Sequence, residues 1–154
     1  MGKYWNEEIE CMAHEDMKKL QSERLVKQVK HVWDNVPYYK KLMEEKGVTP
    51  DDIHGIEDLH KLPFTEKTDL RDNYPFGLFA VPQSQIVRIH ASSGTTGKAT
   101  VTGYTRRDIS NWADCMARSL AMAGLSAKDI IHVAYGCGLF TGGPGLNGGS
   151  QKLG

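Results

Sequence analysis

The sequence predicts an α/β protein in which a helical first half leads into the beginning of a parallel sheet. Apolar residues recur at helical spacing up to about residue 46, whereas short β-branched runs stand in the second half, where glycine also becomes frequent. The 154 residues are 40% hydrophobic and 25% charged, which excludes a disordered tail or a disulfide scaffold. We expect an N-terminal helical segment over residues 1–80 and the truncated start of an α/β domain over residues 81–154.

Helices are predicted for most of the first half. A helical pair is expected over residues 7–46, divided at Pro37, because apolar residues recur at three- and four-residue steps: Leu25, Val29, Val32 and Trp33. Thr49 precedes a proline and two acids, which is a capping pattern and predicts a short helix. Thr65 predicts another helix start, and residues 73–77 are typical of a turn.

The second half changes its period. Residues 86–90 and 99–104 predict the two strands of a hairpin, and Thr105 begins a capping box for an amphipathic helix that ends at Gly124. Residues 130–135 form a nearly continuous apolar run, which is typical of a strand buried on both faces, and His132 is expected in the core. A glycine-rich stretch then opens a second helix without a following strand. The sheet would be incomplete, so we expect the chain to be a fragment.

Composition excludes several classes of function. Nineteen Lys and Arg residues balance nineteen Asp and Glu residues, so no overall field attracts nucleic acid or an anionic membrane. The three cysteines are widely spaced, as in a reduced cytoplasmic protein, and the six histidines show no metal-binding spacing. The N-terminus has no apolar signal core, and no stretch approaches the ~20 apolar residues that span a bilayer. A cytoplasmic protein without metal, nucleic-acid or membrane partners is predicted.

The stretch most informative about function follows the first predicted strand. It combines four hydroxyl residues, two glycines and a lysine: Ser92, Ser93, Gly94, Thr95, Thr96, Gly97 and Lys98. Glycines let successive backbone N–H groups turn toward one anion, and the hydroxyls and the ammonium group add to the site, so the loop suits a polyphosphate. It is not a Walker A loop, because only two residues separate its glycines and Ala99 follows the lysine. An ordinary hairpin turn is the alternative.

With its flanking residues, this loop resembles the phosphate loop of the adenylate-forming enzymes, which include acyl-CoA synthetases, luciferases and peptide-synthetase adenylation domains. Further stretches are similar to phenylacetate–CoA ligases in particular: residues 37–39, 58–65, 70–78, 103–105 and 135–143. The resemblance runs from about Trp5 to Gly154.

The resemblance implies a ligase that works in two steps. The carboxylate of an aryl acid, with phenylacetate ranked first, attacks ATP to give an acyl-adenylate and pyrophosphate, and the thiol of CoA then displaces AMP; Mg²⁺ accompanies ATP. Residues 92–98 would hold the β- and γ-phosphates, with Lys98 neutralising charge on the leaving pyrophosphate. Tyr135 and Phe140 match positions that line the aryl pocket, and core packing is the alternative for both. His90 is expected to hydrogen-bond the loop backbone rather than the nucleotide.

The resemblance also sets limits on the chain by itself. The family's adenine- and ribose-binding residues and its adenylation lysine correspond to segments beyond residue 154, so no catalytic residue is expected here and the chain alone is predicted to be inactive. The unpaired run at 130–135 predicts a dimer or larger assembly. Three alternatives stay open: a related coenzyme adenylyltransferase, a nucleotide-binding module without catalysis, and a truncated product without function.

The sequence departs from the family pattern at three places. Ala99 stands where a proline is usual, and Cys137 stands where an aromatic residue is common. Residues 144–149 replace a less flexible stretch, and Gly148 and Gly149 are unfavourable inside a helix. The pocket is therefore expected to differ in size, or the tail of the chain to be irregular.

Overall fold

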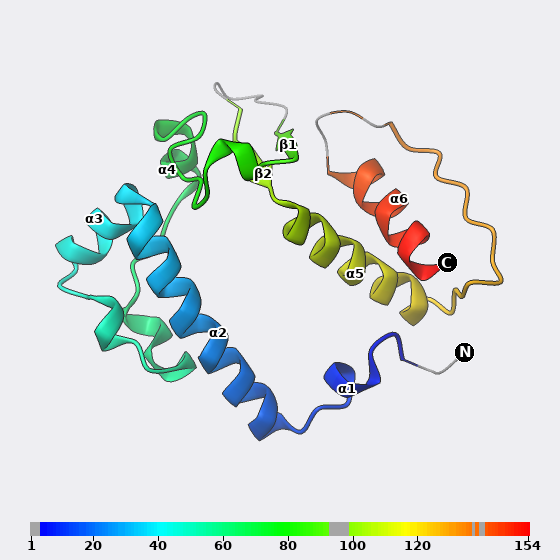
Figure 1. Ribbon diagram of the computed structural model, residues 1–154, viewed down its shortest axis with the longest axis horizontal. Helices are drawn as coiled ribbons and strands as arrows, with labels where there is room; N and C mark the ends of the chain where they lie inside the picture. The colour runs from blue at the N-terminus through cyan, green and yellow to red at the C-terminus, as the bar shows by residue number, and fades with distance from the viewer. Residues whose placement is uncertain (1–3, 93–98, 137, 139–140) are drawn as a thin grey trace. The chain divides into compact units, whose positions relative to one another are not determined.

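The computed structural model describes residues 4–92, 99–136, 138 and 141–154 (Figure 1). The chain forms two compact units. One contains Met12–Gln83, and the other contains Ser84–Gly154 together with the N-terminal residues up to Cys11. Helices and a two-stranded sheet are both present, which confirms the predicted mixture of the two. The division into a helical segment over residues 1–80 and the start of an α/β domain over residues 81–154 stays a prediction.

The first unit contains two helices divided at Pro37 as predicted, α2 (His14–Asn35) and α3 (Pro37–Glu45). The predicted start of this pair at residue 7 is wrong, because residues 7–10 form a separate short helix that belongs to the other unit. Pro37 occupies the first helical position of α3, where its missing N–H costs no helical hydrogen bond. The apolar faces of the two helices and of the following loops meet in one cluster: Val29, Met43, Val48 and Ile53, with Leu25, Trp33 and Leu62 packed against it. This cluster is the core of the unit.

Short helical turns follow the pair. A 3₁₀ turn, η1 (Pro50–Asp52), confirms the short helix predicted after Thr49, whose hydroxyl donates to Asp52 Oδ2 at 2.7 Å. A second turn, η2 (Ile56–Lys61), leads to α4 (Lys67–Asp72). The predicted start at Thr65 is wrong by one residue: Glu66 caps α4, because its backbone N–H donates to Asp69 Oδ2 at 2.6 Å.

Asp58 gives this unit a testable pH dependence. Its carboxylate lies 2.7 Å from Lys61 Nζ and accepts a hydrogen bond from the backbone N–H of His54, and these contacts lower the pKa of Asp58 to about 2. A lowered pKa stabilises the folded state above the unfolded value of about 3.9, and this stabilisation is lost as the pH falls toward 2. We therefore expect Asp58→Asn to be less stable than the parent at pH 7, with the difference shrinking between about pH 4 and pH 2. Urea unfolding at several pH values measures it, with the exposed Asp51→Asn as the control. A difference that stays constant down to pH 2 would contradict this assignment.

The second unit is built on the predicted hairpin, which η3 (Gln83–Gln85) precedes. Strands β1 (Arg88–Ala91) and β2 (Val101–Tyr104) pair antiparallel, with Arg88 opposite Tyr104 and Ala91 opposite Val101. Two longer helices follow, α5 (Arg106–Met122) and α6 (Gly142–Leu153), and the short α1 (Glu7–Glu10) belongs to the same unit. Figure 1 shows α6 lying beside α5.

The predicted boundaries of α5 are confirmed. Asp108 Oδ2 accepts from the backbone N–H of Thr105 at 2.8 Å, and the Thr105 hydroxyl accepts from the N–H of Asp108, which completes the capping box. At the other end Gly124 has a φ of +92°, the left-handed conformation that glycine adopts readily.

The strand predicted at residues 130–135 is wrong for this structure. The segment forms no regular element and joins α5 to α6 as coil (Figure 1). Ile130 is fully exposed, and His132 is exposed rather than part of the core. A strand needs a neighbour for its backbone hydrogen bonds, and the sheet of the described residues contains only β1 and β2. Residues 130–135 therefore have the composition of a buried strand, but among the described residues no neighbouring strand pairs with them.

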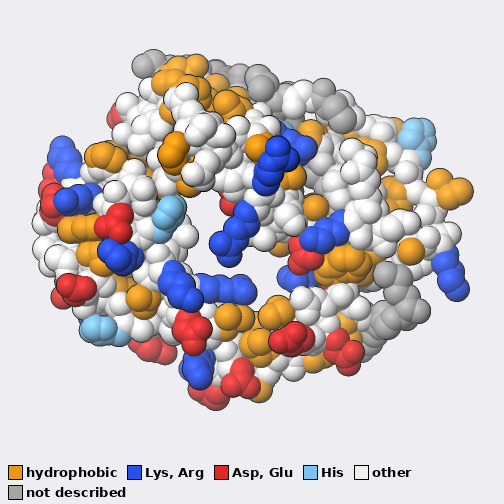
Figure 2. All heavy atoms as spheres, viewed as in Figure 1, with side chains coloured by type: hydrophobic (Ala, Val, Ile, Leu, Met, Phe, Trp, Pro, Cys, Tyr) orange, Lys and Arg blue, Asp and Glu red, His pale blue; other side chains and the backbone are white. Residues whose placement is uncertain are grey.

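Charged side chains of both signs are interspersed over the face shown in Figure 2. On α2 and α3 several of them form ion pairs one helical turn apart, such as Lys30 with Asp34 at 2.9 Å and Lys41 with Glu45 at 3.7 Å. This mixture agrees with the balanced composition of the whole chain. Within the described residues, no helix is long and apolar enough to cross a membrane.

Candidate phosphate loop and acid site

The hairpin closes the base of the predicted phosphate loop. Ser92 N donates to the carbonyl oxygen of Thr100 at 3.0 Å, and Thr100 N donates to the Ser92 hydroxyl oxygen, also at 3.0 Å. Because these two bonds lie just beyond the paired strands, the ends of the loop stay one inter-strand spacing apart. A strand–loop–strand arrangement around residues 92–98 is thus confirmed at its base.

Only the first of the seven predicted phosphate-binding residues belongs to the described part of the chain. Ser92 is exposed, and its hydroxyl oxygen accepts a hydrogen bond from Thr100 N. The other six lie outside the described residues: Ser93, Gly94, Thr95, Thr96, Gly97 and Lys98. Their role stays a prediction.

Three rings pack beneath the hairpin. His90 of β1 is buried, with 3% of its surface exposed, and its ring meets those of Tyr104 and Trp112 edge to face, each at a centroid distance of 5.3 Å. The rings of Tyr104 and Trp112 stack at 5.3 Å with an interplanar angle of 25°. Since Tyr104 lies on β2 and Trp112 on α5, this cluster fixes both strands of the hairpin to the helix. The hydrogen bond expected from His90 to the loop backbone stays a prediction.

Glycines allow α6 to approach α5 closely. A Cβ at Gly145 would lie 2.6 Å from Trp112 Cζ2, and a Cβ at Gly149 would lie 2.3 Å from Met116 Cβ, distances that side chains essentially never adopt. The glycine-rich tail is therefore helical rather than irregular, because the space its missing side chains leave is filled by the neighbouring helix.

Tyr135 lies at the entrance to α6. Its side chain is 64% exposed, and a Cβ at Gly142 would lie 3.1 Å from Tyr135 Cε1, so the ring rests on the first turn of the helix. The ring is not packed in a core of the described residues, and its role in binding the acid stays a prediction. Phe140, the second predicted pocket residue, lies outside the described residues. That the two residues line one pocket stays a prediction.

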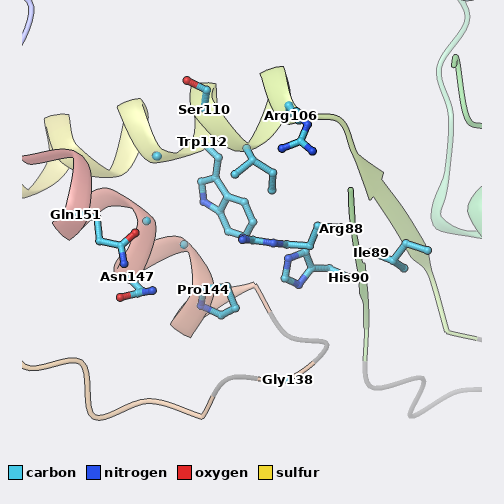
Figure 3. Close-up of a pocket in the computed structure, with 14 residues that line it drawn as sticks. Arg88, Ile89, His90, Arg106, Ser110, Trp112, Gly138, Pro144, Asn147 and Gln151 are labelled. Atoms are coloured by element: carbon cyan, nitrogen blue, oxygen red, sulfur yellow. The ribbon is translucent and has the colours of Figure 1, made fainter. Parts of the chain in front are cut away.

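An open cavity of about 560 Å³ lies between the hairpin, α5 and α6 (Figure 3). Arg88 and His90 point from β1 toward Trp112 of α5, and Pro144, Asn147 and Gln151 line the side formed by α6. Arg106, at the start of α5, adds a second guanidinium group to the lining. Among the described residues that line this cavity, Gly138 comes from the stretch between Tyr135 and α6, and Tyr135 itself is not one of them.

An ionic cluster that the sequence did not reveal joins the ends of this unit. Trp5 donates its indole N–H to Asp114 Oδ1 at 3.0 Å, and Arg118 bridges Asp114 and Glu10 at 3.4 and 3.2 Å. The Trp5 hydrogen bond is the main reason that the pKa of Asp114 lies below its ordinary value, and Lys152 of α6 contributes from 3.4 Å. Trp5 and Asp114 stand 109 positions apart, so no local pattern predicts the pair.

The groups gathered here suit anion binding more than metal binding. Two arginines line the cavity beside the hairpin, whereas the backbone N–H groups of Ser92 and Thr100 bond to each other's oxygens. Among the described residues, no group of three or more His, Cys, Asp or Glu side chains is arranged to hold a metal ion. Binding of a polyanion by residues 92–98 stays a prediction, because six of the seven lie outside the described residues.

Comparison with known sequences gives a consistent picture. No family model matches the chain. The chain is 55% identical over 148 residues to the phenylacetate–coenzyme A ligase of Aromatoleum evansii, 54% over 147 residues to that of Thermus thermophilus, and 57% over 146 residues to that of Escherichia coli. These matches cover 95–96% of this chain and 33–34% of the ligases. The chain thus spans about a third of the length of the curated relatives it matches.

Solved structures show the same relationship. The chain resembles a 2-hydroxyisobutyryl-CoA ligase determined with 2-HIB-AMP and CoA in the thioesterification state, with a TM-score of 0.91 at 32% identity. It also resembles that ligase in the postadenylation state with 2-HIB-AMP, with a TM-score of 0.90 at 30% identity. Both matches cover 99% of this chain and 33% of the ligase.

Proposed function

We propose that this chain, which is an N-terminal segment of the phenylacetate–coenzyme A ligases, supplies the ATP-phosphate loop and part of the acid pocket of such a ligase. The whole enzyme converts phenylacetate, ATP and CoA into phenylacetyl-CoA, AMP and pyrophosphate through an acyl-adenylate. The observation that carries the proposal is identity of 53–57% to four enzymes of that name over nearly the whole chain.

The loop at residues 92–98 acts in the first step. An oxygen of the acid carboxylate attacks the α-phosphorus of ATP. The bond from the α-phosphorus to the oxygen that bridges it to the β-phosphorus breaks, so negative charge grows on the departing pyrophosphate. Backbone N–H groups, hydroxyl groups and the Lys98 ammonium group stabilise that charge. The bonds between Ser92 and Thr100 support this role, because they fix the loop ends before the nucleotide binds. Mg²⁺ enters with ATP.

The ring of Tyr135 contacts the acid, and Phe140 completes the aryl wall. An exposed flat ring at the start of a helix suits the phenyl group of phenylacetate better than a small aliphatic acid, because aromatic rings bury a large flat surface against each other. In the second step the CoA thiolate attacks the acyl carbon and releases AMP.

We place the enzyme in the cytoplasm, and we propose self-association through the region after residue 125.

A hybrid ligase tests the proposed substrate. This chain replaces the matching third of the Escherichia coli ligase, to which it is 57% identical, and acyl-CoA formation is measured with each acid. We expect kcat/KM for phenylacetate to exceed that for 2-hydroxyisobutyrate by about a hundredfold or more, because a flat pocket discriminates by the buried ring. The unaltered Escherichia coli enzyme is the reference. A hybrid that prefers 2-hydroxyisobutyrate would refute the aryl assignment and favour the activity named for the structural neighbour.

A further inference from the structure

We propose that Trp112 is a positioning residue that fixes the base of the phosphate loop relative to the start of α6, with Gly145 as the surface on which it rests. The effect of Trp112 on catalysis rests on the proposed ligase function. Its geometry depends only on contacts among described residues of one compact unit. Trp112 contacts His90, Tyr104 and Gly145, and it would act on the phosphate loop and on Tyr135 through these neighbours.

One side of the indole holds the hairpin. It stacks on Tyr104 of β2 at 5.3 Å and meets His90 of β1 edge to face at 5.3 Å. His90 stands two residues before Ser92, and Tyr104 stands four residues after Thr100, the pair that closes the loop base. A displacement of the indole therefore moves both strands that carry the loop.

The edge of the indole formed by Nε1, Cε2 and Cζ2 lies against α6. A Cβ at Gly145 would meet Trp112 Cζ2, Cε2 and Nε1 at 2.6, 2.7 and 2.8 Å. Gly145 is buried, and its N–H donates to the carbonyl oxygen of Thr141 at 3.1 Å, which places it in the first turn of α6. The rigid ring and the helix backbone are in direct contact, and only glycine permits that contact.

The same turn of α6 supports the proposed acid-binding ring. Tyr135 rests on Gly142, three residues before Gly145. Tyr135, the first turn of α6, Trp112 and the hairpin thus form one continuous series of packed groups. The acid carboxylate must meet the α-phosphorus of ATP. The distance between Tyr135 and the base of the phosphate loop therefore determines how well the two reactants are aligned. A misplacement of about 1 Å is enough to lower a rate by about a hundredfold.

Four variants separate positioning from stability. Gly145→Ala inserts a methyl group against the indole, and Trp112→Phe removes part of the ring. The double variant Trp112→Phe/Gly145→Ala restores room for the methyl group. Gly148→Ala is the matched control, because a Cβ there would meet Ala113 Cβ at 3.7 Å, an ordinary contact.

Amide hydrogen exchange on this chain, without any ligand, gives the first measurement. In Gly145→Ala we expect the protection of the Ser92 and Thr100 amides to fall about tenfold, while amides in the middle of α5 change less than about threefold. The double variant should recover most of the lost protection, and Gly148→Ala should match the parent. An equal loss along α5 and the hairpin, or no rescue in the double variant, would overturn the proposal.

Kinetics of the hybrid ligase give the second measurement. In Gly145→Ala, kcat per molecule of folded enzyme should fall by about a hundredfold because the reactants are misaligned, and the double variant should restore most of it. A kcat per molecule of folded enzyme equal to that of the parent, or no recovery in the double variant, would overturn the positioning role. If the hybrid makes no phenylacetyl-CoA while the exchange pattern holds, the proposed function fails and the contact series stands.

Discussion

Gly149→Ala should lower the free energy of unfolding of this chain by about 2 kcal/mol, the cost of forcing a methyl group into a packed contact. The new Cβ would lie 2.3 Å from Met116 Cβ and 3.0 and 3.1 Å from backbone atoms of Met116 and Ala117. Backbone atoms of α5 cannot rotate aside, so α6 must move away. That movement opens the contact around Ala117 and Leu153, which are 0% and 4% exposed. The higher helix propensity of alanine returns only about 1 kcal/mol.

The neighbouring Gly148→Ala is the matched control. Its Cβ would meet Ala113 Cβ at 3.7 Å, so the helix gains the better residue without a clash. Urea unfolding followed by helical circular dichroism should show Gly149→Ala unfolding at lower urea and Gly148→Ala at equal or higher urea than the parent. Equal midpoints for the two variants would show that α6 does not pack on α5 in this register.

Lys98→Ala in the hybrid ligase should lower kcat/KM for ATP by one to two orders of magnitude, equivalent to ~1.4–2.7 kcal/mol of transition-state stabilisation. The loss follows from removing one charge-assisted donor to the departing pyrophosphate. The KM for phenylacetate should change far less, because the proposal assigns the lysine to the phosphates of ATP and not to the acid.

Lys128→Ala controls for the loss of one positive charge, since Lys128 is exposed in the turn after α5. It should leave adenylation kinetics unchanged. An unchanged rate of pyrophosphate release in Lys98→Ala would show that residues 92–98 form a structural turn, the alternative raised by the sequence.

Local signals predicted the elements that depend on local interactions. The capping box from Thr105, the left-handed Gly124, the proline at the start of α3 and the hairpin flanking residues 92–98 all lie within a few residues of the groups that stabilise them. The loop base, closed by Ser92 and Thr100, follows from the same local pattern. Both partners of each of these interactions lie close together along the chain, so a local sequence pattern is enough to predict them.

Features that depend on distant partners were missed or misjudged. The apolar run at residues 130–135 has the composition of a buried strand, but pairing depends on a neighbour that composition does not supply. Gly149 was expected to be unfavourable inside a helix, whereas its close approach to Met116, like that of Gly145 to Trp112, shows that glycine here allows α6 to pack on α5. The hydrogen bond from Trp5 to Asp114 is equally invisible in sequence, because the two lie far apart along the chain.

Titration of the ¹⁵N-labelled chain with inorganic pyrophosphate, followed by amide chemical shifts, tests the central claim most directly. The claim is that the loop closed by Ser92 and Thr100 holds the phosphates of ATP. We predict saturable shifts centred on residues 92–98 and Thr100, and their loss in Lys98→Ala but not in Lys128→Ala. Saturable shifts centred instead on Arg88 and Arg106 in the neighbouring cavity, or no shifts at all, would contradict it.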